Sequence, residues 1–337
     1  MLNAEIGLFS VDLLYISMEM AIALASVLGN VLVVAVVLVN RTLRDPTFCF
    51  IASLALADIA VGALVIPLAV VINLGLETQF YTCLLLSCLL LVITQGSILT
   101  LLAIAIDRFL RVKIPTRYSS VVTQRRARVA VGLCWILSFV SGLVPMLGWH
   151  KRRNPHLRGN ASGAADRNAA DASVECKFTS VVSMDFMVYF NFFGCVVLPL
   201  VVMVALYGEL FRVICARLDR RAEATCDGDD GRRYYQKELR LAKSLALIVA
   251  LFALCWLPLH ILNCVALFCP GCPLPKAAVY TGIFLSHVNS ALNPLVYAFR
   301  IKRFRVTLIQ ISRRCVPCRP AEPSPCPSGK TKVTPDP

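Results

Sequence analysis

Seven long apolar stretches divide this chain of 337 residues, and each is long enough to cross the hydrocarbon core of a bilayer as a helix. The composition excludes an ordinary soluble domain, because 58% of the residues are hydrophobic and 16% are charged. We therefore predict an all-α membrane protein built as a seven-transmembrane helix bundle. The expected spans are about 12–39, 48–72, 83–106, 127–148, 184–214, 241–267 and 277–299.

Lysine and arginine are concentrated in the loops on one side of the predicted bundle. They gather in residues 41–44, 108–128, 212–243 and 300–305, and short basic loops of this kind lie on the cytoplasmic side. We therefore expect a multi-pass plasma-membrane protein with an extracellular N-terminus over 1–11 and a cytoplasmic C-terminus. The net charge of +14 indicates contact with acidic membrane lipid, and no nucleic-acid module accompanies it in the sequence.

The loop 149–180 is basic as well, yet the alternation of the other loops places it outside the cell. It contains the sequon Asn160-Ala161-Ser162, which predicts glycosylation of Asn160. Two cysteines could hold this loop, since an oxidising exterior permits disulfides. Cys83 at the outer start of the third span with Cys176 would pin the loop over the bundle. Cys269 and Cys272 in "CPGC" either form a local bridge or remain two free thiols.

The residues after the last span predict an amphipathic helix, helix 8, over 300–315. Ile301, Phe304, Leu308 and Ile311 recur at spacings of three and four between lysines and arginines, a pattern typical of a helix lying on the inner leaflet. Cys315 continues this spacing, and with Cys318 it is a palmitoylation pair or a pair of unmodified thiols. The Pro-rich segment 316–337 is expected to be a disordered cytoplasmic tail.

Polar residues inside the spans indicate function, because each is costly in lipid unless it has a partner or a purpose. In the third, sixth and seventh spans, residues recur at helical spacing on one face that begins polar or aromatic near the outer mouth and ends at the cytoplasmic edge, which predicts an outer cavity coupled to an inner surface. Polar contacts between helices are the alternative for about a third of them. No phosphate-binding loop or metal-ligand spacing is present, so an enzyme is not expected. The set includes Glu19, Asp58, Asp107, Arg108, His260, Asn263, His287, Asn289 and Asn293.

The motifs in these spans resemble those of rhodopsin-like (class A) G-protein-coupled receptors. "GNVLV" begins at Gly29, "LALAD" ends at Asp58, "DRF" begins at Asp107, and "CWLP" and "NPLVY" follow in the sixth and seventh spans. The resemblance covers residues 12–311, and its motifs occur in order and in the expected spans. It implies that Pro258 kinks the sixth span into a hinge and that Trp256 is the switch residue beside it.

The same resemblance implies a switch for the G protein. Arg108 would pair with Asp107 and reach Glu238 in the inactive state, and Tyr207 and Tyr297 would assist opening. The third residue of the usual Asp-Arg-Tyr motif is Phe109 here, which removes one hydroxyl group. The family's sodium pocket is matched by Asp58, Ser97, Asn289, Ser290 and Asn293. An allosteric sodium ion is thus expected at this pocket, the alternative being a protonated or water-bridged Asp58, and no other cofactor is expected.

Within class A, the pocket residues resemble those of adenosine receptors. Two other ligand classes are excluded, because the retinal lysine of opsins is replaced by His287 and the aspartate of aminergic receptors by Leu90. The stretches "SMDFMVYFNFF" and "YAFRIKRFRVT" are also similar to adenosine receptors. The resemblance implies that Phe178 stacks on the purine and that Asn263 both donates to and accepts from it. Thr94, Ser286 and His287 would hold the ribose, Glu19 would orient His287, and Leu91, Met187, Asn191, Trp256, Leu259, His260, Tyr280 and Ile283 would complete the pocket.

The resemblance leaves the subtype between the first (A-one) and the third (A-three). Thr179 departs from the glutamate that several adenosine receptors carry after Phe178, which puts selectivity in question. Both subtypes imply adenosine as ligand, inhibitory Gi/o proteins as partners and inhibition of adenylyl cyclase, with arrestin and a receptor kinase as further partners. The alternatives are a class A receptor for a nucleotide or a lipid, and a seven-span transporter, which would require an internal repeat that the sequence does not show.

Overall fold

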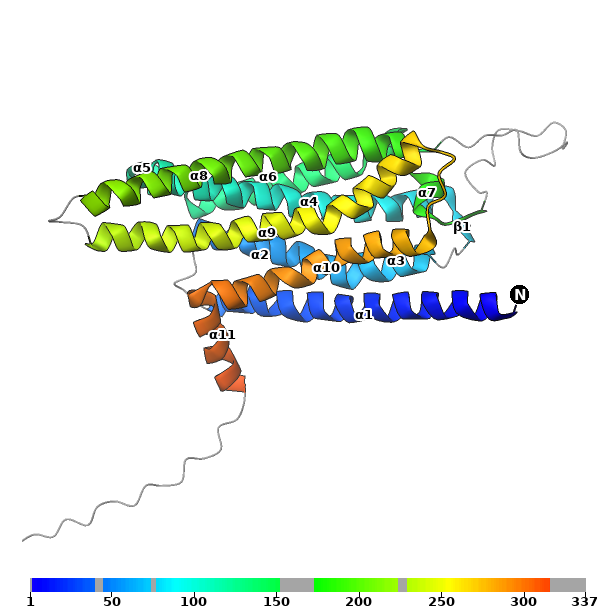
Figure 1. Ribbon diagram of the computed structural model, residues 1–337, viewed down its shortest axis with the longest axis horizontal. Helices are drawn as coiled ribbons and strands as arrows, with labels where there is room; N and C mark the ends of the chain where they lie inside the picture. Colours follow the sequence, from blue (N-terminus) through cyan, green and yellow to red (C-terminus); the bar gives the residue numbers. More distant parts are fainter. Residues whose placement is uncertain (1, 40–44, 74–76, 152–172, 224–228, 316–337) are drawn as a thin grey trace, which may run out of the picture.

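The computed structural model describes residues 2–39, 45–73, 77–151, 173–223 and 229–315. Long helices run side by side along the whole molecule, and a shorter last helix turns away from one end of the bundle (Figure 1). The predicted seven-transmembrane helix bundle is confirmed. In chain order the long segments are α1 (Leu2–Val39), α2 (Pro46–Ala60) with η2 (Val61–Val65) and α3 (Ile66–Asn73), α4 (Phe80–Lys113), α6 (Gln124–Gly142), η5 (Phe186–Val197) with α8 (Leu198–Glu223), α9 (Asp229–Phe268) and α10 (Lys276–Arg300), followed by α11 (Lys302–Cys315).

Short elements close the two ends of the bundle. One end, here called the disulfide end, carries β1 (Glu77–Gln79), β2 (Ser173–Glu175) and α7 (Phe178–Val181), and the other, the α11 end, carries α5 (Pro115–Val121) and α11 (Figure 1). A 3₁₀ turn, η3 (Val144–Leu147), follows α6.

Five of the helical segments in the described part of the chain are long and apolar enough to span a membrane: Asp12–Val39, Pro46–Ile72, Phe80–Lys113, Phe186–Arg220 and Gly231–Phe268. The two remaining long helices pack in the same bundle but are more polar. α6 begins with three arginines, and α10 carries the polar residues that made its span the least apolar in the sequence. Large apolar side chains on α1 and α6 point out of the bundle, as a lipid-facing surface requires; Leu14, Leu24, Val129 and Leu133 are among them.

Several helices extend beyond the predicted spans. α1 begins at Leu2 rather than near 12, α4 continues to Lys113 rather than 106, and α9 begins at Asp229 rather than 241. Hydropathy locates the part of a helix that lies in lipid, whereas the polar turns beyond it are helical without being apolar. The fifth span departs from the α form, because Pro199 lacks the N–H that an α-helix would donate, and the preceding segment Phe186–Val197 winds as a π-helix.

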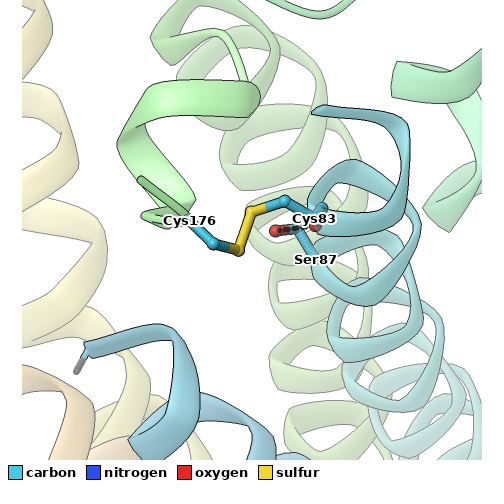
Figure 2. Close-up of a disulfide and its surroundings, with 3 residues drawn as sticks. All are labelled: Cys83, Ser87 and Cys176. Carbon is cyan, nitrogen blue, oxygen red and sulfur yellow. Dashed lines mark hydrogen bonds between the residues drawn. A yellow bond between two sulfur atoms is a disulfide. The ribbon is translucent and has the colours of Figure 1, made fainter. Parts of the chain in front are cut away.

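The disulfide end is tied together covalently. β1 and β2 pair antiparallel, with Glu77 opposite Glu175, which brings the residue after β2 beside the start of α4. Cys83 and Cys176 form a disulfide there, with Cα atoms 5.6 Å apart, and the Ser87 hydroxyl donates to the Cys83 carbonyl at 2.9 Å (Figure 2). The second pair is also joined, so the open alternative for "CPGC" resolves to a bridge between Cys269 and Cys272.

Small residues allow neighbouring helices to approach closely. A Cβ atom on Gly29 would lie 3.0 Å from Pro294 Cγ, so the glycine lets α1 pack against the middle of α10. A Cβ atom on Gly142 would lie 2.6 Å from Val92 Cγ2 and 2.7 Å from the Val92 nitrogen, which fixes α6 against α4. Close packing of this kind is the main source of helix association in a bilayer.

Candidate functional site

The polar side chains of α1 and α10 meet directly inside the bundle. His287 Nδ1 lies 2.8 Å from Glu19 Oε2, and both side chains are buried, Glu19 completely. The other carboxylate oxygen, Glu19 Oε1, has no hydrogen-bond partner among the described residues. The pair therefore fixes the orientation of the imidazole and leaves its second nitrogen available to a further group.

His260 on α9 lies in an aromatic stack. Its ring is 4.6 Å from the Phe192 ring at an interplanar angle of 16°, and 6.0 Å from the Trp256 ring. The side chain is only 2% exposed, yet neither ring nitrogen has a hydrogen-bond partner within the described residues, and the same holds for Trp256 Nε1. Buried polar atoms are almost always paired, so these unpaired ones mark a place where water or a ligand completes the structure.

Hydroxyl groups on α4 and α10 bond to their own helices. Thr94 donates to the Leu90 carbonyl at 2.9 Å, and Ser286 donates to the Ile283 carbonyl at 2.6 Å. Each oxygen keeps lone pairs that can accept from a ligand hydroxyl. Asn191 differs, because its amide oxygen accepts from Gln95 Nε2 at 2.5 Å and both side chains are buried.

The other predicted pocket residues lie toward the disulfide end. Leu91 and Met187 are buried in the apolar cluster beneath Cys83–Cys176, and Phe178 packs against that cluster from α7. Asn263, Leu259, Ile283 and Tyr280 are partly buried on α9 and α10. Tyr280 also has polar partners on α1, since its hydroxyl donates to Asp12 Oδ1 at 2.9 Å.

The predicted sodium residues are all buried in the bundle, and two of them are in direct contact. Asn293 Nδ2 donates to Asp58 Oδ2 at 2.7 Å, while Asp58 Oδ1 has no partner among the described residues although the side chain is completely buried. Ser97, Asn289 and Ser290 are buried as well. An unpaired buried carboxylate oxygen among hydroxyl and amide oxygens is a donor set that suits a hard cation.

Asn30 reinforces this region and was missed by the sequence reasoning. Its side-chain nitrogen donates to the carbonyls of Ser26 and Ser290, each at 2.9 Å, and so joins α1 to α10. Ser26 in turn donates to the Asp58 carbonyl at 2.8 Å. The signal in the sequence is an amide side chain within an apolar span, which also marks Gln95.

A charged network occupies the α11 end of α4. Arg108 is 2% exposed, and its Nη2 donates to Asp107 Oδ2 at 2.9 Å. Its Nη1 lies 3.4 Å from Glu238 Oε2 on α9, a longer and weaker contact. The three residues named from the resemblance are therefore brought together, and they link α4 to α9.

Two further residues hold Asp107 and were not predicted. Thr47 donates to Asp107 Oδ2 at 2.5 Å, and Tyr118 of α5 donates to Asp107 Oδ1 at 2.6 Å. Arg111 in turn donates to the Tyr118 hydroxyl at 3.0 Å. Burial and then the charge of Asp107 raise the pKa of Tyr118 to about 12, so Tyr118 remains a neutral donor. Tyr118 lies outside the predicted spans, eleven residues from its partner, and no periodic signal in the sequence points to it.

The remaining switch residues lie between the two regions. Pro258 is inside the continuous helix α9, two residues from Trp256. Tyr207 and Tyr297 are buried, and neither hydroxyl has a partner in the described part of the chain. Cys315 is the last residue of α11, and the predicted modification sites Asn160 and Cys318 lie outside the described residues.

Comparison with known proteins agrees with this arrangement. Residues 29–297 match the model of the family described as 7 transmembrane receptor (rhodopsin family). The chain is 48% identical over 308 residues to adenosine receptor A3 of Bos taurus, covering 91% of this chain and 92% of the relative. It is 48% identical over 312 residues to adenosine receptor A2b of Bos taurus, with the same coverage, and 45% identical over 316 residues to adenosine receptor A3 of Canis lupus familiaris, covering 94% and 96%.

Proposed function

This chain belongs to the rhodopsin family of seven-transmembrane receptors and, within it, to the adenosine receptors, and we propose how its residues bind the ligand and transmit the signal to an inhibitory Gi/o protein. It is a multi-pass receptor of the plasma membrane and not an enzyme. The A3 relatives fit the third subtype, one of the two that the sequence indicated.

The proposal for the ligand rests on one observation above the others. His287 is fixed by the buried carboxylate of Glu19 at 2.8 Å, while the ring nitrogens of His260 are buried and unpaired. A ribose hydroxyl near His287 and a polar group near His260 would satisfy these atoms. The purine would then extend toward Phe178 for stacking and toward Asn263, whose amide can donate to and accept from an amino-substituted ring.

The signal is proposed to travel along α9. In this structure Arg108 is paired with Asp107 and reaches Glu238, an arrangement that holds the α11 ends of α4 and α9 together. A ligand that repacks Trp256 would favour bending at Pro258, where the helix lacks one backbone hydrogen bond. The contact of 3.4 Å between Arg108 and Glu238 is the weaker of the two ion pairs and would be lost first. The opened end would receive the Gi/o protein, and Tyr207 and Tyr297 have free hydroxyls with which to hold that state.

Sodium is proposed to oppose this change. The ion would be held by the unpaired Asp58 Oδ1 and by oxygen atoms of four other buried residues, Ser97, Asn289, Ser290 and Asn293. The bound ion would supply a positive charge that compensates the buried carboxylate. The ion favours the inactive state if it binds that state more tightly than the active one. A ligand that prefers the active state must then bind less tightly to the receptor that holds sodium.

The orientation follows from the basic loops, with the disulfide end outside the cell and the α11 end in the cytoplasm. Glycosylation of Asn160 and palmitoylation of Cys315 and Cys318 are consistent with that orientation. Arrestin and a receptor kinase would act on the same α11 end as the G protein.

The proposal is tested by adenosine-dependent inhibition of forskolin-raised cAMP in cells that express the wild type or Asn263→Ala at matched surface levels. We expect a response in the wild type that pertussis toxin blocks and that the variant loses. Silence of the expressed wild type at millimolar adenosine would exclude the ligand assignment. A cAMP response that survives pertussis toxin would exclude Gi/o coupling but would leave the ligand assignment standing.

A further inference from the structure

A third connection between α1 and α10 lies at their disulfide ends, beyond the Glu19–His287 pair. Lys276, the first residue of α10, donates from Nζ to Asp12 Oδ1 at 2.8 Å and to Oδ2 at 3.0 Å. The Tyr280 hydroxyl donates to the same Asp12 Oδ1 at 2.9 Å. The Tyr280 ring stacks on Tyr15 of α1, with ring centroids 4.1 Å apart and an interplanar angle of 14°.

The network acts as one unit. Lys276 Nζ also lies 5.2 Å from the centre of the Tyr280 ring, so the cation contacts both the carboxylate and the ring that Asp12 holds. The hydrogen bond with Asp12 raises the pKa of Lys276, which keeps the pair charged at neutral pH. The ion pair is exposed, with side-chain exposures of 48% for Lys276 and 36% for Asp12. An exposed pair is weak and reversible by itself, which suits a contact that opens and closes.

Helical spacing places this network in line with the ribose site. Tyr15 precedes Glu19 by four residues on α1, and Tyr280 precedes His287 by seven on α10, so each pair of positions lies on one helix face. The stacked rings of Tyr15 and Tyr280 therefore lie between the buried Glu19–His287 pair and the disulfide end. A ligand that reaches His287 from that end would pass beside these two rings, which form the seam between α1 and α10.

We propose that Asp12 and Lys276 form a latch that holds Tyr280 against Tyr15 and thereby controls how fast ligand enters and leaves the pocket. Asp12 and Lys276 are positioning residues in this scheme, acting through Tyr280. Because the latch closes the free and the occupied receptor alike, weakening it lowers the barrier in both directions. Association and dissociation should accelerate together while the dissociation constant stays nearly constant. The inference rests on the proposed adenosine site.

The test uses the full-length receptor in cell membranes and a radiolabelled adenosine analogue, with association and dissociation rates measured separately. Asp12→Ala removes every acceptor of the network, and Lys276→Met removes the charge but keeps the aliphatic stem. We expect each to raise both rates about threefold, as befits the loss of one exposed pair and its hydrogen bond, with the dissociation constant changed less than about twofold. The exchanged double variant Asp12→Lys, Lys276→Asp restores a pair of opposite charges and should return both rates toward wild type.

Glu209→Gln is the matched control, because it removes an exposed ion pair, with Arg212 at 2.6 Å, that lies within α8. Unchanged rates in both latch variants would overturn the proposal. A rise in the dissociation rate alone, with weaker affinity, would also overturn it, because that pattern indicates a direct contact with the ligand.

A readout without ligand separates failure of the latch from failure of the adenosine assignment. Ile283→Cys places a thiol on α10 between Tyr280 and His287, and its labelling by a small charged thiol reagent reports opening of the seam. Labelling should be about threefold faster when Asp12→Ala is added, in line with the ligand rates. Equal labelling with and without Asp12→Ala refutes the latch even if the wild type binds no adenosine analogue, whereas faster labelling in a receptor that binds none supports the latch and rejects the ligand.

Discussion

Glu238→Gln should increase the activity of the receptor in the absence of ligand. The change removes the negative charge that lies 3.4 Å from Arg108 Nη1, in the ion pair of this network that crosses from α4 to α9. Arg108 remains paired with Asp107 at 2.9 Å, so no buried charge is left uncompensated and the receptor should still fold. The substitution therefore isolates the link between helices from the stability of the bundle.

The magnitude follows from the distance and the burial. At 3.4 Å the bare Coulomb attraction is about 5 kcal/mol at an effective dielectric constant of ~20. Most of this is offset by desolvation, because Arg108 is 2% and Glu238 12% exposed, and a net contribution of about 1 kcal/mol remains. A change of 1 kcal/mol shifts the equilibrium between the two states about fivefold. If about 1% of the wild type is active without ligand, about 5% of the variant will be.

The assay is basal inhibition of forskolin-raised cAMP at matched surface expression, with adenosine deaminase present to remove endogenous ligand. Glu209→Gln is the control, since it removes the same charge from a pair that lies three residues apart on α8 and links no helices. Basal activity equal to wild type, with a normal maximal response to agonist, would refute the reasoning that this contact restrains α9.

Four further substitutions test other parts of the structure. Cys176→Ser opens a disulfide between cysteines 93 positions apart and should lower the free energy of unfolding by about 4–5 kcal/mol in the chain-entropy model, so surface expression should fall sharply. Cys269→Ser opens a disulfide between cysteines 3 positions apart, and this variant should be expressed normally. Tyr118→Phe removes one hydrogen bond to Asp107, worth about 1 kcal/mol, and should raise basal activity about fivefold in the cAMP assay. Because the folded-state pKa of Tyr118 is raised to about 12, its contribution to stability is complete below about pH 10 and is lost only above that, so thermal unfolding of wild type and Tyr118→Phe should differ by a constant amount from pH 6 to 9. Asp58→Asn should abolish the effect of sodium chloride, relative to choline chloride, on agonist affinity; a sodium effect of wild-type size in the variant would place the ion elsewhere.

The sequence revealed the residues that are expensive in lipid but not how they are paired. Asp58, Asp107 and Glu19 were recognisable because a carboxylate in an apolar span is rare, and motif spacing supplied partners for them. Gln95 and Asn191 are uncharged, 96 residues apart and in separate spans, so their contact depends on how η5 winds before Pro199. The hydrophobic pattern of the sequence does not predict this π-helical winding, since π turns have no characteristic period in the hydrophobic residues.

Residues at the helix ends were harder to predict for a different reason. Asp12 and Lys276 are two ordinary charges among the 20 acidic and 34 basic residues of the chain, and they lie 264 positions apart. Their meeting depends on α1 and α10 extending as helices past the lipid boundary, where hydropathy carries no information. The same limit applies to Tyr118, which comes beside Asp107 because α5 folds back onto the end of α4.

The placement of these networks constrains how ligand energy can be used. In the described part of the chain, polar contacts join α1 and α10 at three levels: Asp12 with Lys276, Glu19 with His287, and Asn30 with the Ser290 carbonyl. Within the described residues, by contrast, the ion pair that links α9 to α4 is one contact of 3.4 Å, and α9 contains Pro258. A ligand bound between these helices therefore meets one rigid wall and one movable wall. Its differential binding free energy must act on α9, and about 2.7 kcal/mol is enough to bring a 1% active population to one half.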